Sequence, residues 1–256
     1  EAVTKRPKRS VPTRKSPESR SPDPNPSGSS RNLDPDPNPP ESRSESGPYD
    51  NRTLFQRKML LHEKLQTRRL LLASQSPRRR ELITGCGLPY ELAPKYDCEE
   101  RYPAELAAEE VPLYLSQLKS RAYPEPLGER DILLTADTVV VLDGEVLGKP
   151  RDREDALRML RRLAGRRHTV VSGVTLRSRE QMCTFDARTS VWLRDLSDEE
   201  IAYYVDTYHP FDKAGSYGIQ EWIGYVAIER IEGSFYNVMG LPIQKLYTEL
   251  NKFLNA

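Results

Sequence analysis

Short blocks of apolar residues, separated by polar turns, run through the sequence from about residue 68 onward. The block 70–73 is a short continuous apolar run that predicts a buried strand, and the longer block 132–142 predicts the strongest strand of the chain. Asp143-Gly144 follows as a two-residue hairpin signal, so we expect the chain to return through residues 146–147. Residues 168–177 and 184–194 alternate well enough to be paired strands, and a further strand is expected at 222–231.

Helical patterns alternate with these strands. Ser76 and Pro77 offer an N-cap and a proline at the first helical position, which predicts a helix over 78–84 that stops at Gly85. Further helices are expected over 111–122 and from the Ser197–Glu200 capping box through Val205. A helix from Asp152 to Gly165 should face inward with Ala156, Leu160 and Leu163. After a loop at 233–240, the last helix should face inward with Ile243, Leu246, Tyr247 and Leu250. The elements predict a mixed α/β fold around a partly antiparallel sheet.

The first 48 residues differ sharply in composition from the rest. They hold 11 of the 21 prolines and 10 serines but only four apolar residues, too few to offset the entropy of ordering a chain. We therefore expect a disordered basic, Pro- and Ser-rich tail over 1–48, a lead-in helix over 49–67 and one domain over 68–256. The tail is either a plain solvated extension, an anionic-partner segment or a targeting peptide, and a natural start is expected near Met59.

Composition excludes several classes of protein. No apolar run approaches the roughly 18–20 residues of a membrane span, so no membrane association is expected. Three cysteines are too few and too scattered for a disulfide framework or a structural zinc site, which favours a cytoplasmic location. A net charge of +1 gives no general case for nucleic-acid binding.

The turn before the helix at 78–84 is the first candidate for chemistry. A helix N-terminus is an anion site, and the forked guanidinium groups of Arg78 and Arg79 match phosphate oxygens. Ser74 and Ser76 add hydroxyl donors. An ordinary capped helix with a solvated basic face is the alternative.

Asp137 is the second candidate, because it lies in the middle of the apolar block 132–142. A buried carboxylate is costly unless it is paired or bound to a cation. Its two reasonable roles are general base for a water molecule and ligand for a hard divalent metal, against the alternative of a strand-end residue on a wet face.

Scattered charges could complete a triphosphate site. Glu99 and Glu100 lie in an acidic loop, Lys119 on a helix and Lys149 after the hairpin, and singly each is an ordinary surface charge. As a set they would supply cations for phosphate oxygens and carboxylates for Mg²⁺.

Two later loops are also candidates. In the segment 212–220, Gly215 and Gly218 allow close backbone approach, and the Gln220 amide can match the donor and acceptor edge of uracil or thymine. Tyr236 and Asn237 either line the same cleft or cap the last helix. The three histidines have no ligand or triad spacing and are interpreted as structural.

Four motifs in this order resemble the Maf family of nucleoside triphosphate pyrophosphatases, over about residues 68–254. They are Ser74-x-Ser76-Pro77-Arg78-Arg79, Thr135-Ala136-Asp137-Thr138-Val139-Val140, Gly148-Lys149-Pro150, and Asp212-Lys213-Ala214-Gly215 with Tyr217-Gly218-Ile219-Gln220. The sequence departs from relatives in the acidic loop, where Glu99 stands in place of an aspartate, and at Ser120, where alanine is usual.

The resemblance implies an elongated, curved mixed sheet flanked by helices around a central cleft, similar to the inosine-triphosphatase (Maf/Ham1) fold. It implies metal-assisted hydrolysis of dTTP and UTP to monophosphate and pyrophosphate, with removal of non-canonical pyrimidine nucleotides as a further role. Asp137 matches the proton acceptor, Arg78, Thr138 and Gln220 match the specificity residues, and Glu100, Lys119 and Lys149 match other polar positions of the cleft.

We accordingly expect phosphate binding by Ser74, Ser76, Arg78, Arg79, Lys119 and Lys149, and a divalent cation (Mg²⁺, Mn²⁺ or Co²⁺) at Glu100 and Asp137. Relatives suggest a homodimer. A non-hydrolytic nucleotide-binding regulator of cell division, or a nucleic-acid-binding protein acting through the basic tail, are the rival functions.

Overall fold

The structure is a computed structural model that describes residues 60–255. The expected tail over 1–48 and the first part of the expected lead-in helix lie outside the described residues. The last part of that lead-in is helical, because helix α1 (Leu61–Lys64) continues into the 3-10 helix η2 (Leu65–Thr67).

The core element is a seven-stranded mixed sheet, which confirms the expected α/β fold. Its strand order is β2-β1-β3-β5-β6-β7, with β4 paired to β3. β1 runs parallel to β2 and β3, and the other pairs are antiparallel. The strands are β1 (Arg69–Leu72), β2 (Glu91–Leu92), β3 (Asp131–Leu142), β4 (Glu145–Leu147), β5 (Arg167–Arg177), β6 (Met182–Leu193) and β7 (Ile228–Glu232).

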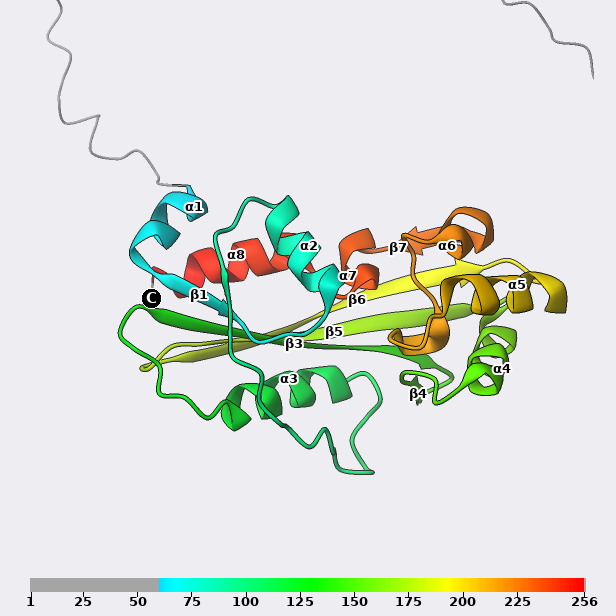
Figure 1. The fold of residues 1–256 in the computed structure, drawn as a ribbon, viewed down its shortest axis with the longest axis horizontal. Helices are drawn as coiled ribbons and strands as arrows, with labels where there is room; N and C mark the ends of the chain where they lie inside the picture. The colour runs from blue at the N-terminus through cyan, green and yellow to red at the C-terminus, as the bar shows by residue number, and fades with distance from the viewer. Residues whose placement is uncertain (1–59, 256) are drawn as a thin grey trace, which may run out of the picture. The chain divides into compact units, whose positions relative to one another are not determined.

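Helices cover both faces of the long strands (Figure 1). They are α2 (Pro77–Gly85), α3 (Val111–Ala122), α4 (Arg153–Leu163), α5 (Asp198–Tyr208), the 3-10 helix η3 (Ala214–Ser216), α6 (Trp222–Ala227), α7 (Phe235–Met239) and α8 (Ile243–Phe253). Val139 and Val141 of β3 pack beneath α3, whereas Val140 and Leu142 join the main core on the other face. This alternation is the period of two that a strand imposes on its side chains.

The predicted caps are confirmed at two helices. The Asp152 carboxylate accepts from the Asp155 N–H at 2.8 Å, and Ser197 with Glu200 forms the expected capping box of α5. Ser76 is the residue before α2, but its side chain makes no capping bond; instead Ser74 Oγ accepts from the Ser76 N–H at 3.2 Å. In this turn the accepting hydroxyl is therefore that of Ser74, and it bonds the residue before the helix rather than a helical N–H.

Three expectations near the C-terminus are wrong. The strand expected at 222–231 is helix α6 followed by the shorter strand β7, because Ile223 and Ala227, four residues apart, both point into the core. The expected loop at 233–240 contains the short helix α7, which Ser234 caps by accepting from the Asn237 N–H. Leu246 and Leu250 of α8 are buried as expected, but Tyr247 is exposed.

A gap in the sheet positions the site. β1 pairs with residues 131–134 of β3, and β4 pairs with residues 140–142 on the same edge. Within the described chain no strand covers this edge of β3 between those two segments. Both faces of β3 therefore open onto one space there, so residues on opposite faces of the strand can line a single cavity.

Candidate active site

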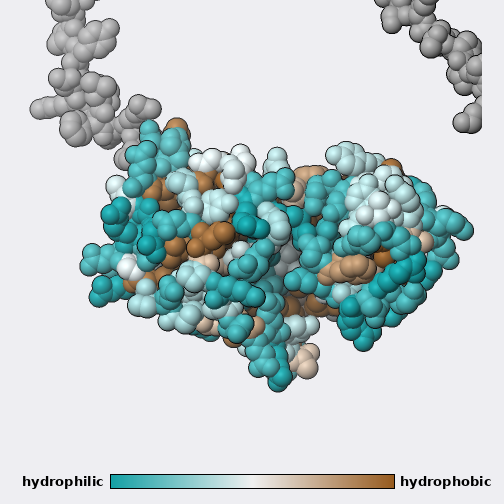
Figure 2. Space-filling model, in the orientation of Figure 1, coloured by the Kyte–Doolittle hydropathy of each residue, from teal (hydrophilic) through white to brown (hydrophobic). Residues whose placement is uncertain are grey.

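All ten predicted site residues line one cavity of about 780 Å³ at this gap. The surface is hollowed at this place between hydrophilic side chains (Figure 2). Segments distant in sequence build the walls: the turn before α2, the acidic loop, α3, the middle of β3, the residues after β4, and the segment 212–220. The ten are Ser74, Ser76, Arg78, Arg79, Glu100, Lys119, Asp137, Thr138, Lys149 and Gln220.

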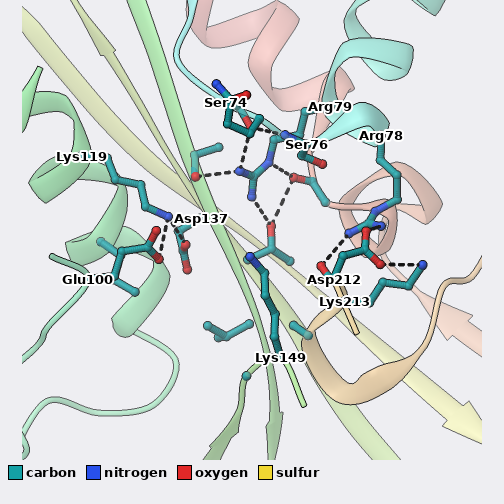
Figure 3. A pocket seen from close by; sticks show the side chains of 18 of the residues that line it. Ser74, Ser76, Arg78, Arg79, Glu100, Lys119, Asp137, Lys149, Asp212 and Lys213 are labelled. Atoms are coloured by element: carbon teal, nitrogen blue, oxygen red, sulfur yellow. Dashed lines mark hydrogen bonds and ion pairs between the residues drawn. The ribbon is translucent and has the colours of Figure 1, made fainter. Parts of the chain in front are cut away.

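Asp137 is buried, with 8% of its surface exposed, and it is paired, as the cost of burying a carboxylate requires. The Lys119 Nζ of α3 lies 2.6 Å from Asp137 Oδ1 and 2.9 Å from Glu100 Oε2 (Figure 3). Burial raises the pKa of the Asp137 carboxyl, while the charges of Lys119 and Arg79 oppose that rise. A raised pKa makes the carboxylate a better proton acceptor than an exposed aspartate.

Arg79 binds the open edge of β3. Its guanidinium donates to the Ala136 carbonyl at 2.9 Å and to Thr138 Oγ1 at 3.1 Å, the residues on either side of Asp137. It also donates to the Gly240 carbonyl at 2.8 Å and to Ser74 Oγ at 3.4 Å. These contacts use four of the five guanidinium N–H groups, so Arg79 chiefly holds the strand edge, and one donor is left for a phosphate.

Arg78 reaches the opposite wall of the cavity. Its Nη1 lies 2.7 Å from Asp212 Oδ2, at the start of the segment that contains Gln220 (Figure 3). Lys149 is exposed and has no ion-pair partner among residues 60–255. It points toward the Arg79 group from the other side of the cavity (Figure 3). Both cations are available to an anionic ligand.

A buried tyrosine, Tyr217, attaches the segment 213–220 to the sheet. The Tyr217 hydroxyl shares a 2.7 Å hydrogen bond with His168 Nε2 of β5, and burial lowers the pKa of His168 to about 4. His168 is therefore neutral at pH 7, and it lies outside the cavity lining, which agrees with its structural interpretation. Gln220 lies at the end of this segment, and its buried Oε1 has no hydrogen-bond partner in the described part of the chain.

Three other residues that the sequence suggested as candidates lie outside the site. Glu99 lies outside the cavity lining and pairs with Arg101 at 2.6 Å. Tyr236 is exposed and also lies outside the lining. Asn237 neither lines the cleft nor caps the last helix, since its Nδ2 donates to the Val170 and Ala187 carbonyls and ties α7 to the sheet.

Sequence reasoning missed an ion-pair chain beside the cavity. Asp212 and Lys213 lie in a quoted motif but received no role, and Glu221 and Tyr204 lie outside every motif. Lys213 is buried and its Nζ lies 2.8 Å from Asp212 Oδ1 and 3.0 Å from Glu221 Oε1. The adjacent residues Asp212 and Lys213, followed by Gly215 and Gly218, were the available signal in the sequence. The pairing of Lys213 with Glu221 depends on how the loop between them folds, which residue spacing does not show.

The cavity fits a cation that arrives with a phosphate ligand. Among residues 60–255 no group of three His, Cys, Asp or Glu side chains could hold a metal ion. Two carboxylates, Glu100 and Asp137, nevertheless converge on Lys119 at one wall. Mg²⁺ is usually held by one or two carboxylates together with substrate phosphates, which matches this donor set.

The family described as Maf-like protein matches residues 69–253. The chain belongs to the Maf family. A dTTP/UTP pyrophosphatase of Porphyromonas gingivalis is 53% identical over 193 residues, covering 75% of this chain and 97% of the relative. A Bacteroides thetaiotaomicron protein of the same name is 54% identical over 183 residues, covering 72% of this chain and 95% of the relative.

Among solved structures, a HAM1 protein from Coxiella burnetii aligns with 72% of this Maf protein and 99% of its own chain, at 13% identity and a TM-score of 0.41. All three cysteines of the Maf protein are free. None of the helices in residues 60–255 has both the length and the apolar character needed to cross a bilayer.

Proposed function

We propose that this Maf protein hydrolyses dTTP and UTP to the nucleoside monophosphate and pyrophosphate. The observation that carries the proposal is the buried Asp137, which faces a cavity lined by Arg78, Lys119 and Lys149. A triphosphate has the negative charge that such a cavity attracts. The names of the relatives that are more than half identical to this chain over the aligned residues support the same reaction.

The proposed reaction needs one proton acceptor and several cations. Asp137 accepts a proton from a water molecule as the water oxygen forms a bond to the α-phosphorus. The bond from the α-phosphorus to the bridging oxygen breaks, and pyrophosphate leaves with the electron pair. Arg78, Lys119 and Lys149 stabilise the charge that develops on the phosphate oxygens, and the turn at Ser74 and Ser76 supplies hydroxyl donors.

Gln220 is the residue we assign to reading the base. Its buried Oε1, which no described residue hydrogen-bonds, can accept the N3–H of thymine or uracil. Thr138, another residue we assign to specificity, lines the same cavity, and its Oγ1 contacts Arg79, Ser172 and the Gly240 carbonyl. Modified pyrimidines that keep the N3–H present the same donor, so the proposal includes non-canonical pyrimidine nucleotides.

We assign Glu100 and Asp137 as the residues that would hold Mg²⁺, Mn²⁺ or Co²⁺. When bound, the cation would neutralise phosphate charge and orient the triphosphate. Lys119 lies between the two carboxylates and keeps their mutual repulsion low in the absence of a cation.

Replacement of the proton acceptor tests the proposal. Asp137→Asn should reduce pyrophosphate release from dTTP and UTP by about a thousandfold, the scale expected for loss of a general base. Asp143→Asn is the matched control, because Asp143 is an exposed aspartate at the end of the same strand. The assay is run with Mg²⁺ and with a chelator, and the chelator should stop turnover.

Two results would count against the proposal. Near-normal pyrophosphate release by Asp137→Asn would remove Asp137 from the mechanism. Tight dTTP binding by the unmodified protein without any pyrophosphate release would favour the rival, a nucleotide-binding regulator.

We also propose a homodimer in the cytoplasm, which sedimentation analysis and cell fractionation would test.

A further inference from the structure

An unbroken chain of polar contacts connects the phosphate side of the cavity to the base-reading segment. It begins at Arg78 and runs through Asp212 and Lys213 to Glu221. Glu221 Oε2 then accepts a hydrogen bond from the hydroxyl of Tyr204, on helix α5. The Tyr204 hydroxyl in turn accepts the N–H of Gly218 at 3.0 Å.

The position of Tyr204 makes it a fixed support. The residue is fully buried, and its ring stacks on Tyr208 at 5.2 Å. Its hydroxyl is the point at which α5, Glu221 and the backbone of Gly218 meet. Without that hydroxyl, the Gly218 N–H would be a buried donor with no partner, which is costly.

Glycine at position 218 belongs to the same arrangement. A Cβ there would lie 2.9 Å from the Glu221 carboxylate carbon and 3.0 Å from Lys213 Cε. The Lys213–Glu221 pair therefore packs directly against the backbone that Tyr204 holds. Gln220 lies between two fixed points, Gly218 and Glu221, whose backbones are also joined by a 3.0 Å hydrogen bond.

We propose that Tyr204 is a positioning residue that sets base selectivity by fixing the segment 218–221 and hence the direction of the Gln220 amide. Tyr204 does not line the cavity, so it acts through the backbone rather than on the ligand. The inference rests on the proposed function only in taking a pyrimidine as the base that Gln220 reads.

The test is Tyr204→Phe, with Tyr208→Phe as the matched control. Tyr208 lies one helical turn further along α5, stacks on the same ring, and has its hydroxyl outside the contact chain. Dissociation constants for dTMP and dGMP are measured by calorimetry, and KM and kcat for dTTP and dGTP by pyrophosphate release.

In Tyr204→Phe, we expect affinity for dTMP and kcat/KM for dTTP to fall about tenfold, through KM, as expected when one buried donor loses its partner. The values for dGMP and dGTP should change less than twofold, as should kcat at saturating dTTP. Tyr208→Phe should keep the selectivity of the unmodified protein. An equal loss of affinity for dTMP and dGMP, or an unchanged ratio of their dissociation constants, would overturn the proposal.

Two further measurements keep the result unambiguous. If Tyr204→Phe does not fold, Glu221→Met removes the carboxylate that accepts from the Tyr204 hydroxyl and pairs with Lys213, with the exposed Glu229→Met as control. The monophosphate measurements need no turnover: a protein that releases no pyrophosphate would refute the proposed function, while the dTMP-to-dGMP ratio would still decide the role of Tyr204. An unmodified protein with no preference between dTMP and dGMP would refute that role.

Discussion

Two adjacent arginines illustrate how differently neighbouring residues of one motif can act. Arg79 is bonded to the carbonyls of Ala136 and Gly240 and to Thr138, all of them parts of the fold. Among residues 60–255, Arg78 makes side-chain hydrogen bonds only to the partly exposed Asp212. The sequence predicted phosphate binding for both, because a guanidinium in a basic turn looks the same whichever acceptor it meets.

The contrast predicts that the same substitution affects stability at Arg79 and mainly substrate binding at Arg78. Arg79→Lys should lower the free energy of unfolding by about 2–3 kcal/mol, because a lysine cannot reach acceptors in three directions and leaves carbonyls unpaired. Arg78→Lys should lower it by less than about 1 kcal/mol, as for other exposed ion pairs, while raising the KM for dTTP. Urea denaturation and steady-state kinetics on both variants measure this, and equal losses of stability would show that Arg79 has no special structural role.

His168 predicts a specific acid sensitivity. Its pKa is about 4 in the folded protein and about 6.5 when unfolded, so it stabilises the fold above pH 6.5, and this stability is lost progressively as the pH falls toward 4. Between pH 7 and pH 5 the loss should be about 2 kcal/mol. His168→Gln should show a correspondingly smaller decrease in unfolding free energy over this interval. Identical pH slopes for the two proteins would contradict the assignment.

At the scale of elements, α3 is held against the sheet at a glycine. Gly173 of β5 is the register partner of Asp137, and a Cβ there would lie 2.2 Å from the Pro112 carbonyl oxygen at the start of α3. α3 carries Lys119 to the Asp137 carboxylate. The close approach of helix and sheet therefore places Lys119 beside Asp137, the candidate proton acceptor.

Gly173→Ala should accordingly separate α3 from β5. We expect a loss of about 2 kcal/mol in unfolding free energy, typical of overpacking, together with reduced pyrophosphate release. Gly85→Ala is the control, because Gly85 ends α2 and a Cβ at that position would meet nothing within 4 Å, so its effect should stay within about 1 kcal/mol. Normal stability of Gly173→Ala would mean that the helix can shift without cost.

Across the whole domain, the cavity joins residues that are far apart in the chain. The turn at 74–79, the middle of β3 and the segment 212–220 all contribute, and Arg78–Asp212 already bridges two walls. A triphosphate that contacts these walls at once should therefore stabilise the fold as a unit.

The corresponding prediction uses a dTTP analogue with an imido group between the α- and β-phosphates, which cannot be cleaved there. At a hundred times its dissociation constant, with Mg²⁺, it should raise the free energy of unfolding by about 2.7 kcal/mol. Hydrogen exchange should slow in residues 74–79 and 212–220 simultaneously. Protection confined to one of these segments would show that the ligand does not span the cavity.

The sequence alone determined the elements whose patterns are local. The apolar block around Asp137, the cap at Asp152 and the capping box at Ser197 each depend on neighbours within a few residues, and each appears in the structure. The strand expected at 222–231 is wrong over its first six residues, which form helix α6. Their Trp, Ile, Tyr and Val side chains favour strands, but burial of Ile223 and Ala227 against the core favours a helix.

Only the tertiary structure decided how the motifs act on one another. The gap between β1 and β4 opens one edge of β3, and this lets Asp137 on one face and Thr138 on the other line the same cavity. The bonds of Arg79, the Arg78–Asp212 pair and the support from Tyr204 join different elements of the fold. Such contacts depend on the meeting of distant surfaces, which a pattern of neighbouring residues does not encode.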